Sequence, residues 1–342
     1  MSRKHLKVAA VLAVGALTLS ACTSKNDSTS AASTAASGAE AVTVAFVPKL
    51  QGIPYFEAMN AGGQKAAEEL GIEWLYQGPT TADAAAQSEI VRAFIQQKVD
   101  VLVVAPNDPD SMAPLLQEAK DAGIRVATSD TDAPNSVREL FVNQTTPENH
   151  GRALAESLAE AMGGAGEFAI VSCSETASNL NSYIEEINKV MAADFADITL
   201  VDTVYAGEDQ AKAASMATDL MNAHPDLTGV VGLCSAAAPG VAQAVRDAGR
   251  IGEVFTVGGG TPTAMAPYLL DGSSSASVLW DVENLGFLTA WAGAELAADT
   301  QFEPAFDVNS DITGVTYDAA TSIMLLGDPL VFTKDNVEQF DY

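Results

Sequence analysis

The chain has 342 residues, of which 48% are hydrophobic and 18% are charged, and its formal net charge at pH 7 is −28. This excess of acid excludes a protein that holds nucleic acid by its phosphates, because such binding needs a basic surface, and it argues equally against direct adhesion to anionic lipid. With three histidines and three cysteines in the whole chain, zinc sites and histidine-based catalytic triads have little support.

The chain begins with a segment typical of export. Residues 1–21 combine a positively charged start with an apolar run, Val8 to Leu19, that is too short to span a bilayer. The run ends in Leu-Ser-Ala-Cys, which resembles the bacterial lipobox, in which the cysteine is lipidated and becomes the mature N-terminus. We therefore predict a signal peptide over 1–21, lipidation of Cys22, and an extracytoplasmic protein anchored to the cell membrane. The alternative is an ordinary signal peptide with an incidental cysteine.

The next segment has almost no apolar surface to bury. Residues 22–41 are nearly all Ser, Thr, Ala and small polar residues, a composition that predicts a disordered lipoprotein stalk. The rest of the chain, residues 42–342, has about the size at which a single core divides into two domains.

From residue 42 onwards, apolar strand-like runs alternate with helical patterns. The first set of strand-like runs is 42–48, 72–76, 100–106 and 124–129, and the second set is 168–172, 198–206, 229–235 and 254–259. Apolar residues recur at helical spacing between them. Nearly continuous apolar strands that alternate with helices are typical of a parallel sheet covered on both faces. Two such sets predict an α/β protein of two doubly wound parallel-sheet lobes joined by a hinge.

We assign residues 42–145 plus 281–310 to the N-terminal lobe, and residues 146–280 plus 311–342 to the C-terminal lobe and hinge. Ligands bind doubly wound sheets beyond the carboxyl ends of the strands. Two such lobes that face each other would therefore hold a ligand in the cleft between them.

Short sequences at these strand ends match a known family. They are FVPKLQGIPYF at 46–56, YQGPT at 76–80, TSDTD at 128–132, FVNQTTP at 141–147, VGGGTP at 257–262, LWDV at 279–282 and the ending VFTKDNVEQFDY. As a set they resemble the type I periplasmic binding proteins of ABC sugar importers, in the branch of the Lsr-type autoinducer-2 and rhamnose binding proteins. The resemblance implies a periplasmic-binding-protein-like fold, capture of a ligand by closure of two lobes, and delivery to an ABC permease with its ATPase subunits.

The resemblance also implies a ligand-binding site. Lys49 matches a lysine that contacts ligand hydroxyls, and Asp130 matches a carboxylate at the fourth strand end; charge-assisted hydrogen bonds of this kind are the stronger ones. Tyr55 and Phe56 match an aromatic pair of the family's cleft, and Trp280 lies where the chain crosses between lobes. Aromatic faces pack against sugar C–H groups. The alternatives are a turn aspartate at position 130 and core packing for the aromatic residues.

The second lobe departs from the autoinducer-2 binders. Where they carry an Asp-Gln pair, this chain has Asn179 followed by leucine, and where they carry Pro-x-Ala it has Leu-Cys-Ser at 233–235. A leucine cannot replace the hydrogen bonds of a glutamine amide. We therefore expect a small neutral sugar, deoxysugar or polyol, read by Asn179, Asn181 and Ser235. Autoinducer-2 binding, and sugar sensing for a membrane sensor, remain as alternatives.

The sequence gives no support for catalysis or metal binding. Asp130 and Asp132 are close carboxylates at a strand end without a partner base, and the DVNSD segment at 307–311 has isoleucine where a calcium loop demands glycine. We expect a monomer that is not an enzyme, with no catalytic residue, no metal site and no cofactor. Cys173 and Cys234 each follow a strand-like run, and both a disulfide and a pair of buried thiols remain open.

Overall fold

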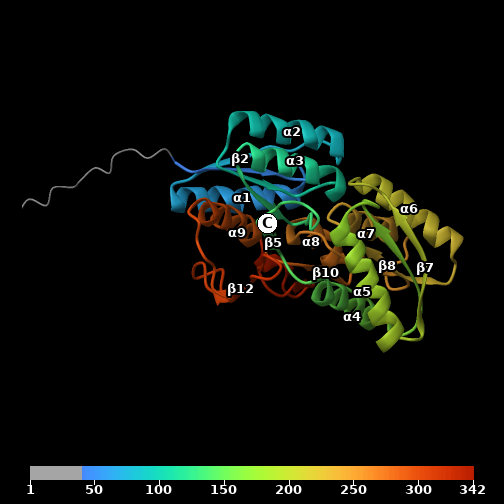
Figure 1. The fold of residues 1–342 in the computed structure, drawn as a ribbon. Coiled ribbons are helices and arrows are strands. Elements are labelled where there is room, and N and C mark those ends of the chain that lie inside the picture. Colours follow the sequence, from blue (N-terminus) through green and yellow to red (C-terminus); the bar gives the residue numbers. More distant parts are fainter. Residues whose placement is uncertain (1–40) are drawn as a thin grey trace, which may run out of the picture. The chain divides into compact units, whose positions relative to one another are not determined.

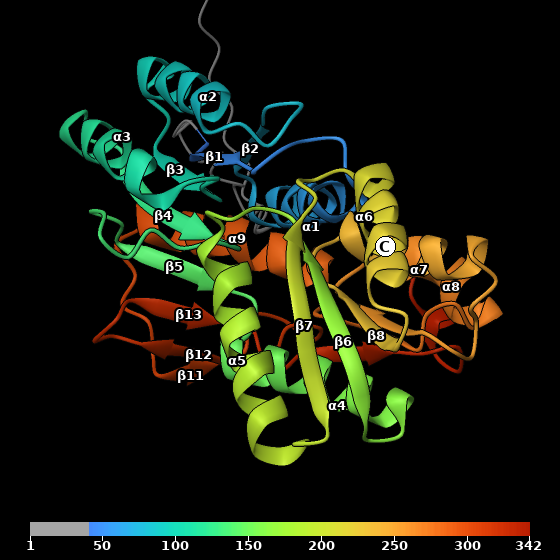
Figure 2. The ribbon, with the colours of Figure 1, turned by 90° about the vertical axis from the view of Figure 1, so that its right-hand side faces the viewer.

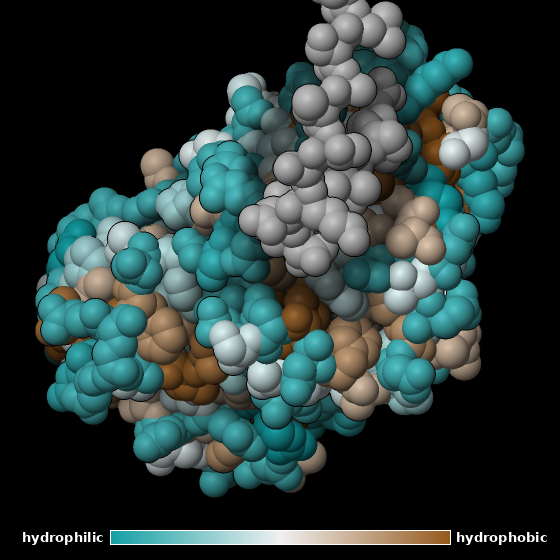
Figure 3. Space-filling model, turned by 90° about the vertical axis from the view of Figure 1, so that its left-hand side faces the viewer, coloured by the Kyte–Doolittle hydropathy of each residue, from teal (hydrophilic) through white to brown (hydrophobic). Residues whose placement is uncertain are grey.

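The structure, a computed structural model, describes residues 41–342 (Figure 1). The predicted signal peptide, the predicted lipidation site Cys22 and the stalk up to residue 40 lie outside the described residues. Among those residues, each helix is too short or too polar to cross a membrane. On the face shown in Figure 3, hydrophilic side chains surround separate hydrophobic patches, in keeping with the acidic composition.

The first sheet contains eight strands. They are β1 (Thr43–Val47), β2 (Glu73–Tyr76), β3 (Val101–Val104), β4 (Arg125–Ser129), β5 (Leu140–Asn143), β11 (Ala305–Phe306), β12 (Val315–Asp318) and β13 (Ile323–Leu325). Their order across the sheet is β11-β12-β13-β5-β4-β3-β1-β2. Strands β1 to β5 and β13 pair in parallel, whereas β12 pairs antiparallel with β11 and β13.

The second sheet contains six strands. They are β6 (Gly166–Ser172), β7 (Ile198–Tyr205), β8 (Leu227–Gly232), β9 (Phe255–Gly258), β10 (Ala276–Leu279) and β14 (Leu330–Phe332). Their order is β14-β10-β9-β8-β6-β7, and only β14, at one edge, runs antiparallel to its neighbour. All residues of β3 in the first sheet and of β10 in the second are buried, as expected of apolar strands covered on both faces.

Helices cover both sheets (Figures 1 and 2). Those that accompany the first sheet are α1 (Pro54–Leu70), α2 (Ala84–Gln97), α3 (Pro109–Asp121) and α9 (Val282–Ala297). Those that accompany the second are α4 (Pro147–Met162), α5 (Ser178–Asp194), α6 (Gln210–Ala223), α7 (Ala237–Asp247), α8 (Pro262–Asp271) and the short 3-10 helix η1 (Val337–Gln339). Several helices begin where an aspartate or threonine accepts a backbone N–H of the first turn, as Asp83 does for α2 and Asp209 for α6.

Helices α1 and α9 pack very closely against each other. Glycines allow this approach: a Cβ atom at Gly62 would collide with the carbonyl oxygen of Glu283, and one at Gly286 would collide with that of Met59. Because α1 follows β1 and α9 follows β10 in the chain, this contact joins the start of the first lobe to the segment that returns from the second sheet. It thereby fixes Tyr55 at the start of α1 close to Trp280, just before α9.

The predicted fold of two doubly wound parallel-sheet lobes is confirmed. The chain passes from one sheet to the other between β5 and β6, between β10 and β11, and between β13 and β14. One predicted boundary is wrong. The sequence places residues 311–342 in the C-terminal lobe and hinge, but β12 and β13 form a hairpin whose β13 adds in parallel to β5, with Met324 opposite Val142. The last crossing to the second lobe therefore lies between Leu325, where β13 ends, and Leu330, where β14 begins.

Candidate functional site

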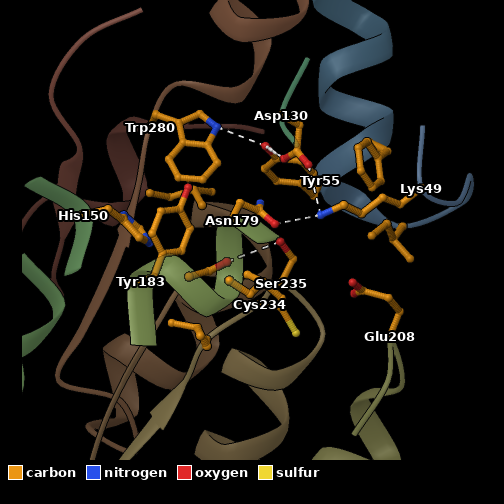
Figure 4. Close-up of a pocket in the computed structure, with 16 residues that line it drawn as sticks. Lys49, Tyr55, Asp130, His150, Asn179, Tyr183, Glu208, Cys234, Ser235 and Trp280 are labelled. Atoms are coloured by element: carbon orange, nitrogen blue, oxygen red, sulfur yellow. Dashed lines mark hydrogen bonds and ion pairs between the residues drawn. The ribbon is translucent and has the colours of Figure 1, made fainter. Parts of the chain in front are cut away.

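A cavity lies where loops from the carboxyl ends of strands in both sheets meet (Figure 4). The space open to the centre of a water molecule measures about 50 Å³. One water needs about 10–15 Å³ on this measure, so the cavity has room for a few waters or for one small molecule. Its lining combines charged, amide and aromatic side chains. The residues that line it include Lys49, Tyr55, Phe56, Asp130, His150, Asn179, Leu180, Tyr183, Glu208, Cys234, Ser235 and Trp280.

A buried ion pair forms the polar centre of the cavity. Lys49, in the loop after β1, lies with its Nζ 3.2 Å from Oδ2 of Asp130, which directly follows β4, and the two side chains are 8% and 5% exposed. The same Nζ donates to Oδ1 of Asn179 at 3.2 Å. Asn179 belongs to α5 of the second lobe, so Lys49 connects an acid of its own lobe to an amide of the other.

Asp130 is held by more than the lysine. Its Oδ1 accepts a hydrogen bond from the Tyr55 hydroxyl and its Oδ2 accepts one from the Thr131 hydroxyl, both at 2.8 Å. The backbone of Asp130 has a φ of 64°, a strained conformation that persists only where surrounding contacts enforce it. Here its backbone N–H donates to the carbonyl of Val142 at 3.2 Å, and its backbone carbonyl accepts a hydrogen bond from Nε2 of Gln144 at 3.1 Å.

The aromatic residues serve this network as well as lining the cavity. The indole N–H of Trp280 donates to the Tyr55 hydroxyl at 3.2 Å, and the two rings meet edge to face. Burial raises the pKa of Tyr55 well above its ordinary value, and Asp130 raises it further, so Tyr55 keeps its proton and remains a donor. Phe56 meets Tyr55 edge to face at a centroid distance of 5.0 Å.

In the second lobe, two of the three predicted polar residues line the cavity. Asn179 and Ser235 do so, and the Ser235 hydroxyl donates to the carbonyl of Gly259 at 3.3 Å. Asn181 does not line it, because its amide donates to the carbonyl of Glu175 at 2.9 Å, away from the ion pair. Seven of the eight residues expected to contact a ligand are thus brought together by the fold.

His150, on α4, was missed by the sequence reasoning. It is 1% exposed and lines the cavity, with its ring 4.5 Å from that of Tyr183 and 5.3 Å from that of Trp280. Burial lowers its pKa to about 3, so the ring is neutral near pH 7. Its Nδ1 is buried without a hydrogen-bond partner among the described residues. No motif marked this residue, since it lies inside a helix rather than at a strand end.

Glu208 was also missed, although it occupies a place that the strand-end rule indicates. It follows β7 in the loop that leads to α6, is partly buried, and points its carboxylate towards Lys49 in Figure 4. Burial raises the pKa of this carboxyl, Lys49 lowers it and Asp130 raises it. Applying the carboxyl-end rule to the edge strand of the second lobe would have found it.

Cys173 and Cys234 form a disulfide, which settles the alternative left open by the sequence. The Cα atoms lie 6.0 Å apart, within the usual range for a disulfide. The bond joins the loops after β6 and β8 at the wall of the cavity. Within residues 41–342, these sulfurs and Glu208 are the one group with metal-ligand spacing, but a disulfide has no thiolates to offer, so the group does not fit a metal.

Comparison with known proteins identifies the family. Residues 44–301 match the family described as periplasmic binding protein domain. The chain belongs to this family. Solved structures superpose well on the chain: LsrB from Clostridium saccharobutylicum in complex with AI-2 has a TM-score of 0.82 and 28% identity, and the match covers 88% of this chain and 100% of that one.

Two further proteins are similar to this chain. An ABC transporter solute binding protein from Clostridium phytofermentas with bound L-rhamnose has a TM-score of 0.82 and 27% identity, covering 88% of this chain and 98% of that one. The D-ribose/D-allose-binding protein of Pseudomonas aeruginosa is 31% identical over 195 residues, which are 56% of this chain and 60% of that protein's length. The predicted resemblance to type I binding proteins of the Lsr and rhamnose branch is confirmed. The names of these periplasmic binding proteins agree with the expectation of a non-enzyme.

Proposed function

We propose that the protein is an extracytoplasmic substrate-binding protein of an ABC importer, which captures a small neutral sugar, deoxysugar or polyol between its lobes and delivers it to the permease. The observation that carries the proposal is the cavity itself. It brings an ion pair, an amide and several aromatic faces from two lobes around a space suited to one small molecule. This mixture is typical of a site that holds a small polar ligand by hydrogen bonds and ring packing.

Closure of the lobes is the mechanism that these contacts support. The bond from Lys49 to Asn179 joins the two lobes, and a second bond joins them from the Thr176 hydroxyl to the carbonyl of Asn107 at 3.1 Å. Separation of the lobes would break both bonds and expose the ion pair to water. A ligand that contacts both lobes stabilises the closed form by its greater affinity for that form, and the permease would recognise the closed form.

Autoinducer-2 is the second candidate, because the relative solved with AI-2 covers the chain closely. Leu180 argues against it. This leucine lines the cavity and is 6% exposed, where the autoinducer-2 binders resembled by this chain carry a glutamine. A ligand hydroxyl buried without a partner costs about 1–3 kcal/mol, so each lost contact weakens binding by one to two orders of magnitude.

A thermal-shift panel tests the ligand class. The chain from residue 41 is heated with L-rhamnose, D-ribose, D-xylose, erythritol, xylitol or autoinducer-2, each in large excess. A ligand at 100 times its dissociation constant adds about 2.7 kcal/mol of stability, which is readily measured as a rise in Tm. We expect a sugar or polyol to give the largest rise. A rise with autoinducer-2 alone would establish the alternative ligand, and no rise with any member would contradict the proposal.

The membrane anchor is a separate part of the proposal. The sequence Leu-Ser-Ala-Cys before a stalk of small polar residues supports lipidation of Cys22. Cells that produce the wild type and the Cys22→Ser variant are fractionated, and both fractions are probed for the protein. We expect the wild type in the membrane fraction and the variant in the soluble one. Equal membrane retention of both would show that Cys22 is not the anchor.

A further inference from the structure

We propose that Glu208 is a specificity-determining residue of this cavity, whose carboxylate accepts hydrogen bonds from hydroxyl groups of the bound ligand. It would read the ligand from the second lobe, whereas the ion pair of Lys49 and Asp130 holds it from the first. This inference rests on the proposed function, because it names the part of a sugar or polyol that the site requires.

The carboxylate of Asp130 already has its partners within the protein. Both of its oxygens accept hydrogen bonds, from the hydroxyls of Tyr55 and Thr131, and Lys49 adds an ion pair. A carboxylate accepts about four hydrogen bonds at most, so little capacity is left for a ligand. Lys49 in turn divides its donors between Asp130 and Asn179. The first lobe therefore supplies a preassembled polar wall with few free acceptors.

Glu208 is in the opposite situation. Among the described residues, no N–H, hydroxyl or cationic group lies within hydrogen-bonding or ion-pair distance of its carboxylate. The sulfur of Cys173 lies 3.3 Å from Oε2, but in the disulfide that sulfur has no proton to donate. A carboxylate that is partly buried without donors is costly, and burial raises its pKa accordingly. Donors from a bound ligand would remove this cost.

The loop that carries Glu208 is fixed on both sides. Before it, the backbone N–H of Ala206 donates to the carbonyl of Ser172 and that of Gly207 donates to the carbonyl of Cys173, both at 2.8 Å. After it, the carboxylate of Asp209 caps α6 by accepting the backbone N–H of Lys212 at 2.9 Å. The glutamate is therefore presented to the cavity by a held loop, so that its position does not depend on the ligand.

The other free groups of the cavity complete the chemical description of the ligand. The side-chain N–H₂ of Asn179 donates to no described residue, and neither does the hydroxyl proton of Tyr183, whose oxygen accepts from Gln144 at 2.9 Å. A ligand must thus donate to Glu208 and accept from these groups. Hydroxyls do both. An ammonium group cannot accept a hydrogen bond. A carboxylate group cannot donate one and would be repelled by Glu208, so a sugar acid that brings its carboxylate to Glu208 should be rejected.

Calorimetric titration tests the role of Glu208. The chain from residue 41, which contains both sheets and their hydrophobic cores, is titrated with whichever of L-rhamnose, D-ribose, D-xylose, erythritol and xylitol gives the largest thermal shift. The variants are Glu208→Gln and Glu208→Ala, and the matched control is Glu185→Gln, an exposed acid on α5 that lies outside the cavity. We expect affinity to fall about 10- to 100-fold in both Glu208 variants, and to stay within about twofold in the control.

The melting temperature without ligand distinguishes a role of Glu208 in ligand binding from a structural role. Because burial raises the pKa of Glu208, the charge at neutral pH destabilises the free protein, so Glu208→Gln without ligand should melt at a higher temperature than wild type. A structural glutamate would give a lower one. Wild-type affinity in Glu208→Gln would overturn this inference alone, as would a lower melting temperature. If wild type binds no sugar or polyol of the thermal-shift panel, the proposed function and this inference both fail.

Discussion

Replacing Asp130 by asparagine removes the charge that holds Lys49 inside the protein. The shape of the side chain is nearly kept, but the lysine, 8% exposed at its side chain, is left buried without its counter-charge. Breaking a buried pair by removing one partner costs about 3–5 kcal/mol. We therefore expect Asp130→Asn to lower the free energy of unfolding by this amount even without ligand.

The companion substitution Lys49→Met should cost less. It removes the other charge but leaves Asp130 with its two hydroxyl donors, Tyr55 and Thr131, both at 2.8 Å. The double variant lacks both charges, so no charge is left buried without a partner. Its loss of unfolding free energy should therefore be smaller than the sum of the two single losses by about 1–3 kcal/mol.

Urea unfolding of the chain from residue 41, followed by tryptophan fluorescence and by circular dichroism, measures all four proteins. Both probes are needed because two lobes can unfold separately. The reasoning would be refuted if Asp130→Asn unfolded within about 1 kcal/mol of wild type. Strict additivity of the two single substitutions would refute it as well, since it would mean that the ion pair contributes no coupling.

Three other features of the fold give predictions of their own. Removing the disulfide by Cys173→Ala with Cys234→Ala should cost about 4 kcal/mol in urea unfolding, as a loop-entropy estimate gives for a sequence separation of 61; an unchanged midpoint would contradict a formed bond. Burial lowers the pKa of His150 to about 3, so stability should fall as the pH drops from about 6.5 towards about 3, by about 2–3 kcal/mol at pH 4.5. His150→Phe should lose this part of the pH dependence, and a slope equal to that of wild type would show that the buried ring is not responsible. Gly286→Ala should destabilise by about 1–3 kcal/mol because its Cβ meets helix α1, and wild-type stability would mean that α1 and α9 separate easily.

The fold could be predicted because its physical signal is strong. Strands buried on both faces need continuous apolar runs, such as the wholly buried β3, and two successive sets of such runs with helices between them leave few other arrangements. The C-terminal boundary could not be predicted, because β12 and β13 are short strands of four and three residues. Their place in the first sheet depends on pairing with β5, which no local pattern encodes.

The site was predictable where residues follow strands or match a motif of the resembled family, and not where a helix residue carries no such mark. Lys49 and Asp130 follow β1 and β4, and the fold brings them together as expected. Asn181 was expected beside Asn179, but both belong to α5, where residues two apart point about 200° from each other. His150 lies inside α4, where nothing in the sequence distinguishes it from a helix-core residue.

These two asparagines provide the most direct test of ligand capture between the lobes. Calorimetric titration compares wild type, Asn179→Ala and Asn181→Ala with the probe that gives the largest thermal shift. Asn179 lines the cavity and bonds to Lys49, whereas Asn181, two residues away on the same helix, lies outside it. Our account predicts one ligand per chain for wild type and for Asn181→Ala, and affinity at least about tenfold weaker for Asn179→Ala. Unchanged affinity in Asn179→Ala, or an equal loss in both variants, would contradict it.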